Sequence, residues 1–173
     1  MNSLQKQTLI LIGFMGTGKS TVARRLSKQL ELPFFEMDEM IVEEQEMEIP
    51  NIFQEKGEAY FRNLETALLK KLLQKEKGIL SCGGGIVLRD ENIQAMKKHG
   101  TVILLTAKPE TILQRVKHNQ SRPVLNGKKN IEDITKLMKE REERYHMAAD
   151  ILISTDGKSL SQICEEITDM ITK

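Results

Sequence analysis

The segment between positions 8 and 30 constrains the fold of this chain more than any other. An apolar run, Thr8–Ile12, leads into the glycine-rich Gly13–Ser20, and a helix-like stretch, Thr21–Leu30, follows. Glycines between a buried strand and a helix let backbone N–H groups surround an anion, while the helix N-terminus adds partial positive charge. In this pattern the lysine, Lys19, reaches the β- and γ-phosphates, and the hydroxyl of Ser20 is placed to ligate Mg²⁺. A turn that merely favours glycine is the alternative; we predict a phosphate-binding loop.

Length and charge narrow the class of protein. A chain of 173 residues is long enough for one well-buried domain and short for two. Its formal net charge is only +1, and it contains no Trp, two Tyr and five Phe. A nearly neutral chain with few aromatic rings favours neither a nucleic-acid partner nor an anionic membrane surface. The charges are unevenly distributed along the chain, because residues 36–58 hold nine carboxylates and a single lysine.

Cysteine usage and hydropathy predict a cytoplasmic protein. Cys82 and Cys164 form no metal-ligand or redox spacing, and they fit a reduced compartment. The only apolar run near the N-terminus leads into the phosphate loop, so we expect no signal peptide. No stretch approaches the roughly 20 apolar residues that span a bilayer.

Short apolar runs alternate with longer amphipathic ones, which indicates an α/β domain with a parallel sheet. We expect strands at Leu9–Ile12, Phe34–Glu36, Gly78–Ser81, Thr101–Leu105 and Ile151–Ser154. We expect helices at Thr21–Leu30, Glu58–Leu73, around Ile93–Lys97, and at Thr111–Val116, Ile131–Ala149 and Leu160–Ile171. The turn-rich segment 118–130 is either a lid that closes over a nucleotide or a plain surface loop.

The absence of two motifs favours a kinase over a nucleotide switch. The Asn-Lys-x-Asp segment that selects guanine in the common GTPases is not found in this sequence. A hydrolase also needs an apolar strand ending in Asp for Mg²⁺, and the best apolar runs here end at Gly13, Thr106 and Ser154. The sequence therefore points to a small-molecule kinase.

Two carboxylates follow the second expected strand. Strand residues point alternately, so we expect Glu36 and Asp38 to face the same way, at the sheet edge where ligands bind in open α/β folds. One could orient the water shell of a metal, and the other could accept a proton from an attacking hydroxyl. Alternatively, both are solvated or cap the next helix.

An arginine and a run of glycines also stand out. Arg62 lies three residues before Glu65 on an expected helix, so Glu65 could hold its guanidinium, although such pairs are often exposed and weak. The glycines at 83–85 follow an expected strand directly. They predict a close approach between the backbone and a ligand, with a flexible turn as the alternative.

Over nearly its full length the chain resembles the shikimate kinase family. The resemblance rests on the phosphate loop 13–21, Asp38, the segment 52–65 with Phe53, Phe61, Arg62 and Glu65, the triple glycine, Arg122-Pro123, and Arg141 to Asp150. These occur in the family's order and spacing. The resemblance implies a three-layer α/β fold of the nucleoside-monophosphate-kinase type with a five-stranded parallel sheet. It also implies one domain, with substrate-binding helices at about 38–62 and a lid at about 117–130.

The resemblance implies transfer of the ATP γ-phosphoryl group to the 3-hydroxyl of shikimate, with Mg²⁺, in chorismate and aromatic amino acid biosynthesis. The implied ATP site contains Gly16, Thr17, Gly18, Lys19, Ser20, Thr21, Arg115, which would pack on adenine, and Arg122 from the lid. The implied metal residues are Ser20 and Glu36. The implied shikimate site contains Asp38, Arg62, Gly84, Gly85 and Arg141. Lys19, Asp38 and Arg122 are the implied catalytic residues, and Asp38 is the base. We expect a monomer that acts on shikimate.

Some positions depart from the family pattern. Glu36 stands where the family usually has Asp, Val42 replaces a frequent Glu, and Glu46 lies where Gly is common. Two other functions stay open on the sequence alone. A gluconate-type kinase would share the phosphate loop and lid without needing Arg62, Arg141 and the triple glycine together. A nucleotide-binding protein without turnover is the other alternative.

Overall fold

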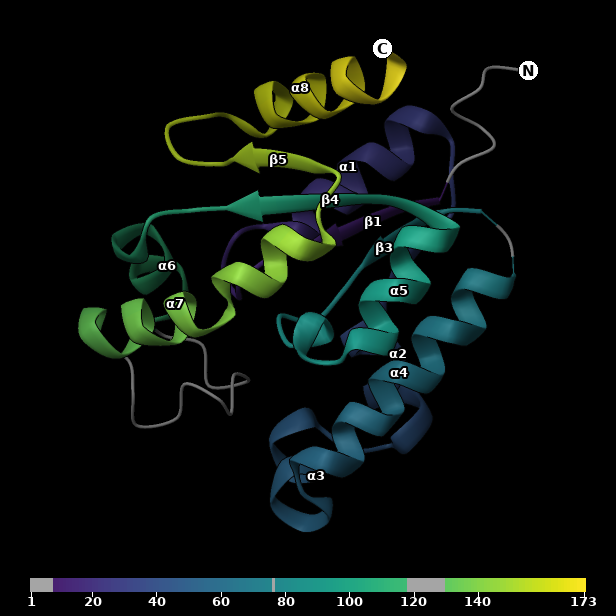
Figure 1. The fold of residues 1–173 in the computed structure, drawn as a ribbon, viewed down its shortest axis with the longest axis vertical. Helices are drawn as coiled ribbons and strands as arrows, with labels where there is room; N and C mark the ends of the chain where they lie inside the picture. Colours follow the sequence, from purple (N-terminus) through teal and green to yellow (C-terminus); the bar gives the residue numbers. More distant parts are fainter. Residues whose placement is uncertain (1–7, 76, 118–129) are drawn as a thin grey trace.

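A parallel sheet forms the centre of the molecule (Figure 1). The structure is a computed structural model that describes residues 8–75, 77–117 and 130–173. In this part of the chain the sheet has five strands in the order β2-β3-β1-β4-β5, and every neighbouring pair is parallel. The strands are β1 Thr8–Ile12, β2 Phe34–Glu36, β3 Ile79–Ser81, β4 Gly100–Thr106 and β5 Ile151–Ser154.

Helices connect the strands and cover both faces of the sheet. They are α1 Lys19–Leu30, α2 Met37–Gln45, α3 Ile49–Lys56, α4 Glu58–Gln74, α5 Asp90–His99, α6 Pro109–Val116, α7 Ile131–Ala148 and α8 Leu160–Thr172, with a short 3-10 turn, η2 Ile86–Leu88. The three-layer α/β fold with a five-stranded parallel sheet is the one that the sequence predicts. Every expected strand is present, with bounds that differ by at most one residue.

Alternation along the central strand explains the three layers. Leu9 and Leu11 pack with α1 and α8 on one face, whereas Ile10 and Ile12 pack with α4, α5 and α7 on the other. Successive side chains of a strand point to opposite faces, so a run that is apolar throughout must be covered on both sides. All five residues of β1 are buried. This places the loop that follows β1 at the middle of the sheet's carboxyl edge.

One expectation about the second strand is wrong. β2 ends at Glu36, and α2 begins at the next residue, so Asp38 lies in the first turn of a helix and does not continue the strand. The alternation argument for residues 36 and 38 therefore fails. An acidic residue in a first helical turn is favoured by the helix dipole, and α2 carries both Asp38 and Glu39 there.

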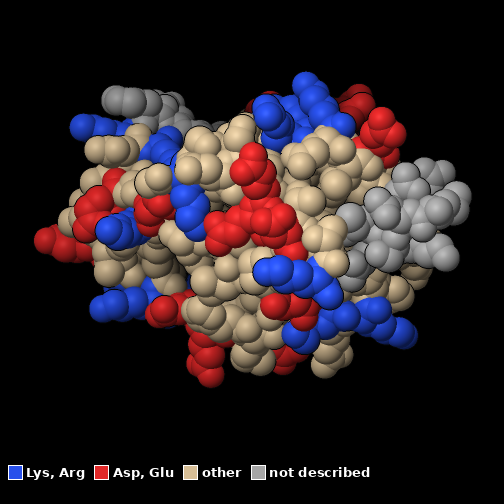
Figure 2. All heavy atoms as spheres, turned by 90° about the horizontal axis from the view of Figure 1, so that it is seen from above, with Lys and Arg blue, Asp and Glu red and all other residues tan. Residues whose placement is uncertain are grey.

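The lid is expected at about 117–130. Only its two end residues, Lys117 and Asn130, are among the described residues, and the rest of the expected lid lies outside them. On the face seen in Figure 2, basic and acidic side chains are interspersed. In the ranges described, no helix combines the length and the apolar character needed to cross a bilayer.

Candidate functional site

The loop between β1 and α1 has the conformation that an anion-binding turn requires. Gly13 has a φ of +146°, and a Cβ added to it would lie 2.4 Å from the carbonyl oxygen of Leu105. Gly18 has a φ of +92° and directly precedes α1. Neither position accepts a residue with a side chain without strain. The loop thus delivers the N-terminus of α1, with its unpaired N–H groups, to the sheet edge.

Lys19 lies inside this loop. Its Nζ donates to the carbonyl oxygens of Gly13 at 2.8 Å and Phe14 at 3.0 Å, and the residue is buried. An ammonium group held at such a turn places a positive charge where phosphates would bind. The phosphate contact of Lys19 stays a prediction, with which this position of the ammonium group is compatible.

Ser20 and Glu36 meet at the start of α1 and the end of β2. The Ser20 hydroxyl donates to Oε2 of Glu36 and lies 3.4 Å from the hydroxyl of Ser81. Burial raises the pKa of Glu36 above its ordinary value, against the effect of the bonds from Ser20 and Ser81. The carboxylate of Glu36, one methylene longer than that of Asp, thus lies within hydrogen-bond reach of Ser20. These hydroxyl and carboxylate oxygens are the donors that Mg²⁺ prefers.

A cavity of about 800 Å³ opens beside this loop. Its wall includes the expected nucleotide, metal and acceptor residues Gly16–Thr21, Glu36, Asp38 and Arg115. The Arg115 Nη1 donates to the carbonyl oxygen of Gly16 at 2.8 Å, which ties α6 to the phosphate loop. The structure therefore brings the residues expected on the ATP side together, except Arg122, which lies outside the described residues.

Arg62 and Glu65 form a buried ion pair on α4. The Arg62 Nη1 donates to Glu65 Oε2 at 2.8 Å, and the side chains are 10% and 2% exposed. The expected contact is therefore present, but it is not the exposed pair that this spacing usually gives. Burial opposes the charge of Arg62, yet Glu65 and Glu58 hold its pKa above the ordinary value. Burial raises the pKa of Glu65 to about 6, although the Arg62 guanidinium acts against this.

The triple glycine packs directly against these charges. A Cβ on Gly85 would lie 2.1 Å from Arg62 Nη1, and one on Gly83 would lie 2.8 Å from Glu65 Oε1 and 2.9 Å from Asp38 Oδ1. None of the three glycines has a positive φ. Close approach, and not turn geometry, is therefore what excludes side chains at positions 83 and 85.

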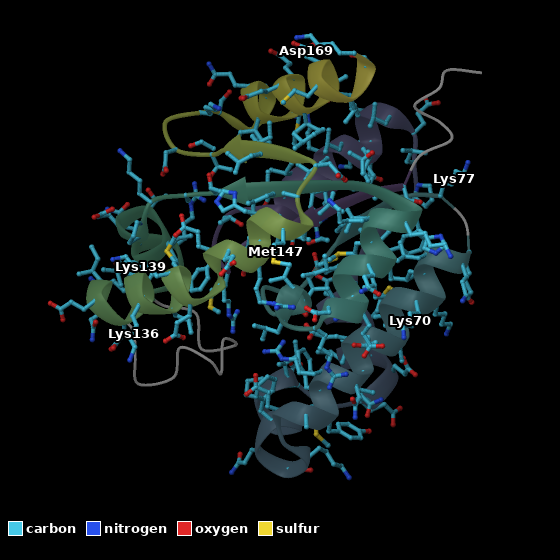
Figure 3. The ribbon with its side chains drawn as sticks, viewed as in Figure 1. Lys70, Lys77, Lys136, Lys139, Met147 and Asp169 are labelled. Atoms are coloured by element: carbon cyan, nitrogen blue, oxygen red, sulfur yellow. The ribbon has the colours of Figure 1, made fainter. Side chains whose placement is uncertain are left out.

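Arg141 reaches the same glycines from α7. It is only 5% exposed, whereas Lys136 and Lys139 of the same helix lie on its outer side (Figure 3). Arg141 hydrogen-bonds the Tyr145 hydroxyl, which donates to the carbonyl oxygen of Gly84 at 2.5 Å. Burial raises the pKa of Tyr145 to about 12. Arg141 is thus not part of a solvated helix face.

The two arginines do not line the large cavity. Its wall includes Asp38 and Gly83, but not Arg62, Gly84, Gly85 or Arg141, which lie immediately behind Gly83. The expected acceptor residues therefore form one cluster next to the cavity. Arg62 and Arg141 are 8% and 5% exposed, so little of either residue contacts solvent in this conformation.

Several residues in the site were not singled out from the sequence. Glu58 accepts from Arg62, and Lys158 in the turn after β5 lines the cavity. The position of Lys158 beyond the carboxyl end of a parallel strand is a signal that could have found it. Cys82 is buried beside the triple glycine, and burial raises its pKa, so its thiol is not a reactive group.

Comparisons with known proteins agree on one family. The family model of shikimate kinase matches residues 15–172. A shikimate kinase from Dehalococcoides mccartyi is 39% identical over 168 residues, or 97% of this chain and 95% of that protein. One from Persephonella marina is 42% identical over 165 residues, or 95% and 99% of the two chains.

Solved structures give the same result. The shikimate kinase from Acinetobacter baumannii in complex with shikimate has a TM-score of 0.92 and 31% identity, over 95% of this chain and 92% of that one. A gluconokinase from Sinorhizobium meliloti has a TM-score of 0.56 at 14% identity, over 94% and 89% of the chains. The second likeness shows the shared fold alone.

Proposed function

This chain belongs to the shikimate kinase family, and we propose that its two buried arginines bind the carboxylate of the acceptor while its phosphate loop binds ATP. The reaction is transfer of the γ-phosphoryl group of ATP to the 3-hydroxyl of shikimate, a step toward chorismate and the aromatic amino acids. The observation that carries the acceptor assignment is the burial of Arg62 and Arg141 beside the triple glycine. A planar guanidinium pairs with a carboxylate through two parallel hydrogen bonds, which makes arginine suited to such a substrate.

On the donor side, residues 16–21 hold the phosphates through backbone N–H groups and Lys19. The Ser20 hydroxyl and the Glu36 carboxylate would hold Mg²⁺, which supplies charge neutralisation between the phosphates. In the described ranges no three His, Cys, Asp or Glu side chains are grouped to hold a metal ion by themselves. This fits an ion whose other ligands are phosphate oxygens and water. Arg115 is assigned to the adenine side of the cavity.

Asp38 lies between the two halves of the site. It lines the cavity with the phosphate loop, and its Oδ1 lies against Gly83, next to the acceptor cluster. In the proposed step the Asp38 carboxylate takes the proton of the 3-hydroxyl as that oxygen attacks the γ-phosphorus. The bond from phosphorus to the β,γ-bridging oxygen breaks, and ADP leaves. Positioning and charge neutralisation, and not covalent chemistry, carry this type of reaction.

The experiment is ADP release by the purified protein with Mg·ATP, with and without shikimate, and with gluconate as the control acceptor. We expect release that depends on shikimate and not on gluconate. Slow release that is indifferent to shikimate would contradict the proposal and favour a nucleotide-binding role without turnover. Omission of Mg²⁺ tests the metal assignment, and sedimentation of the same sample tests the expected monomer.

A further inference from the structure

The two buried arginines of the site differ in how their charges are balanced. The Arg62 guanidinium pairs with Glu65 through Nη1 and with Glu58 through Nε and Nη2. In the part of the chain that the structure describes, no carboxylate forms a salt bridge with Arg141. A buried cation without a paired anion is a site that an anion stabilises on binding. Of these two arginines, Arg62 is therefore the one whose guanidinium is already engaged by carboxylates of the described residues.

The two partners of Arg62 hold it in different ways. Glu65 is 2% exposed in its side chain and binds at 2.8 Å. The Glu58 side chain is 58% exposed and uses one oxygen, Oε1, for both contacts, at 3.3 Å to Nε and 3.1 Å to Nη2. Long contacts to a single exposed oxygen are weaker than a short buried pair. Glu65 is thus the permanent partner, and Glu58 is the one that can leave.

The surroundings of the guanidinium leave little room for a third carboxylate. Gly85 packs against it, and Phe61 and Phe53 lie with ring centroids 5.4 and 5.9 Å from its central carbon. An arginine has five N–H donors, and the bonds to carboxylates use three of them, with Glu58 on the edge formed by Nε and Nη2 and Glu65 on Nη1. The edge formed by Nε and Nη2 is one of the two edges through which a guanidinium forms a pair of parallel hydrogen bonds with a carboxylate. An incoming carboxylate that binds through the edge formed by Nε and Nη2 must therefore take the place of Glu58.

We propose that Glu58 is an internal substitute for the acceptor carboxylate. It occupies the edge of Arg62 formed by Nε and Nη2, and it gives up this edge when the acceptor carboxylate binds there, so that Glu58 sets the affinity for carboxylate acceptors. This inference rests on the proposed function, since the acceptor carboxylate is the group that replaces Glu58. The exchange gives up one exposed oxygen that accepts two long hydrogen bonds and gains two oxygens that each accept one bond of a parallel pair. Glu58 lowers apparent affinity and takes no part in phosphoryl transfer, so its effect is confined to the KM for the acceptor.

Glu58→Gln removes the competing charge, and Glu58→Asp keeps the charge but shortens the side chain by one methylene, which weakens contacts that are already 3.1 and 3.3 Å long. We expect both variants to lower the KM for shikimate about two- to fivefold, the range of an exposed ion pair, with kcat and the KM for ATP unchanged. Glu55→Gln is the matched control, because Glu55 is an exposed carboxylate on the neighbouring helix α3. It should leave the KM for shikimate as it is.

An unchanged or raised KM in the Glu58 variants overturns the proposal, because Glu58 then supports Arg62 and does not compete. An equal fall of the KM for shikimate in Glu55→Gln also overturns the proposal, because the loss of any nearby negative charge would then produce the same effect. Calorimetric binding of shikimate and of its methyl ester separates this inference from the proposed function. Tighter binding of shikimate alone by the Glu58 variants supports the exchange even if turnover is absent. Absence of any shikimate binding by the wild type overturns both.

Discussion

The Arg62 guanidinium donates to the Glu65 carboxylate at 2.8 Å, with both side chains almost fully removed from solvent. Removing one partner of such a pair leaves a buried charge without compensation, which is strongly destabilising. The pair also fixes Arg62 in one orientation beside Gly85. The acceptor site is therefore built on an electrostatic interaction whose strength depends on the protonation of Glu65.

Protonation of Glu65 makes stability depend on pH. Burial raises the pKa of Glu65 from 4.5 to about 6 in the folded chain. Because the folded-state pKa is the higher one, the stability linked to Glu65 is fully present below about pH 4.5 and is lost as pH rises through about 6. The difference corresponds to about 2 kcal/mol. Urea unfolding of wild type and Glu65→Gln between pH 4.5 and 7.5 measures it.

We expect the wild type to lose about 2 kcal/mol relative to Glu65→Gln across that range. Burial also raises the pKa of Glu36, but this contribution is present in both proteins and cancels in the comparison. Parallel stability curves for the two proteins would contradict the assignment of the pH dependence to Glu65.

Alanine substitution at two neighbouring glycines should have unequal effects. A Cβ at Gly85 would lie 2.1 Å from Arg62 Nη1, whereas one at Gly84 would make only ordinary contacts, with the Met15 nitrogen at 3.4 Å and Arg141 Nη1 at 3.6 Å. Gly85→Ala must displace the guanidinium, so we expect the KM for shikimate to rise about tenfold or more. Gly84→Ala is the control and should change it less than twofold. An equal rise of the KM for shikimate in both variants would show that the substitutions disturb the glycine loop as a whole and do not act through Arg62.

Lys19→Ala should reduce turnover on the order of 10²–10³-fold, because the variant loses a charge placed where the phosphates bind. The steady-state rate with saturating Mg·ATP and shikimate is the measurement. Circular dichroism and thermal unfolding check the fold, since the Lys19 side chain also bonds the loop carbonyls. A folded variant with activity near the wild-type value would remove Lys19 from the phosphate site.

Strand positions could be predicted because each strand is a short apolar run with clear limits. Residues 9–12 and 101–105 are recognisable from composition alone, and the structure extends each by at most one residue at either end. Helix α2 was harder, because its apolar residues are few and carboxylates surround them. The sequence therefore suggests the alternation of a strand for Asp38, although a first helical turn also favours an acidic residue.

Burial of the acceptor cluster could not be predicted from spacing. Arg62 and Glu65 have the separation of an ordinary surface pair, and Arg141 lies on a helix rich in charges. Only the tertiary structure brings α4, α7 and the triple glycine together, and only the family resemblance linked them in the sequence. The carboxylate of Glu58 is a further case, since its contact with Arg62 is one of many i,i+4 pairs that a sequence of this charge allows.

The end of α2 stores backbone strain at Glu46. Glu46 has a φ of +51° and a ψ of +35°, the left-handed conformation that residues other than glycine adopt at a cost. Glu31 ends α1 in the same conformation, with a φ of +54°. Glu46→Gly and Glu31→Gly relieve this strain but also increase the conformational entropy of the unfolded chain, which offsets part of the gain. We expect each substitution to raise the free energy of unfolding by a net amount of roughly 0.5–1 kcal/mol. Glu44→Gly, inside α2, should instead lower it by about 1 kcal/mol. Urea unfolding compares the three, and a loss of stability in Glu46→Gly would contradict the strain.

Arg141 gives the sharpest test of the acceptor site. Arg141→Lys keeps a positive charge on α7 but loses the planar fork and the bond to the Tyr145 hydroxyl. We expect the KM for shikimate to rise on the order of tenfold or more, with the KM for ATP within about twofold of the wild-type value, because the nucleotide cavity does not include Arg141. Steady-state kinetics with each substrate varied in turn gives both constants. Lys139→Gln is the matched control on the exposed side of the same helix and should change neither KM. An unchanged KM for shikimate in Arg141→Lys would remove Arg141 from the carboxylate site, and an equal rise in both KM values would show a general disturbance of α7.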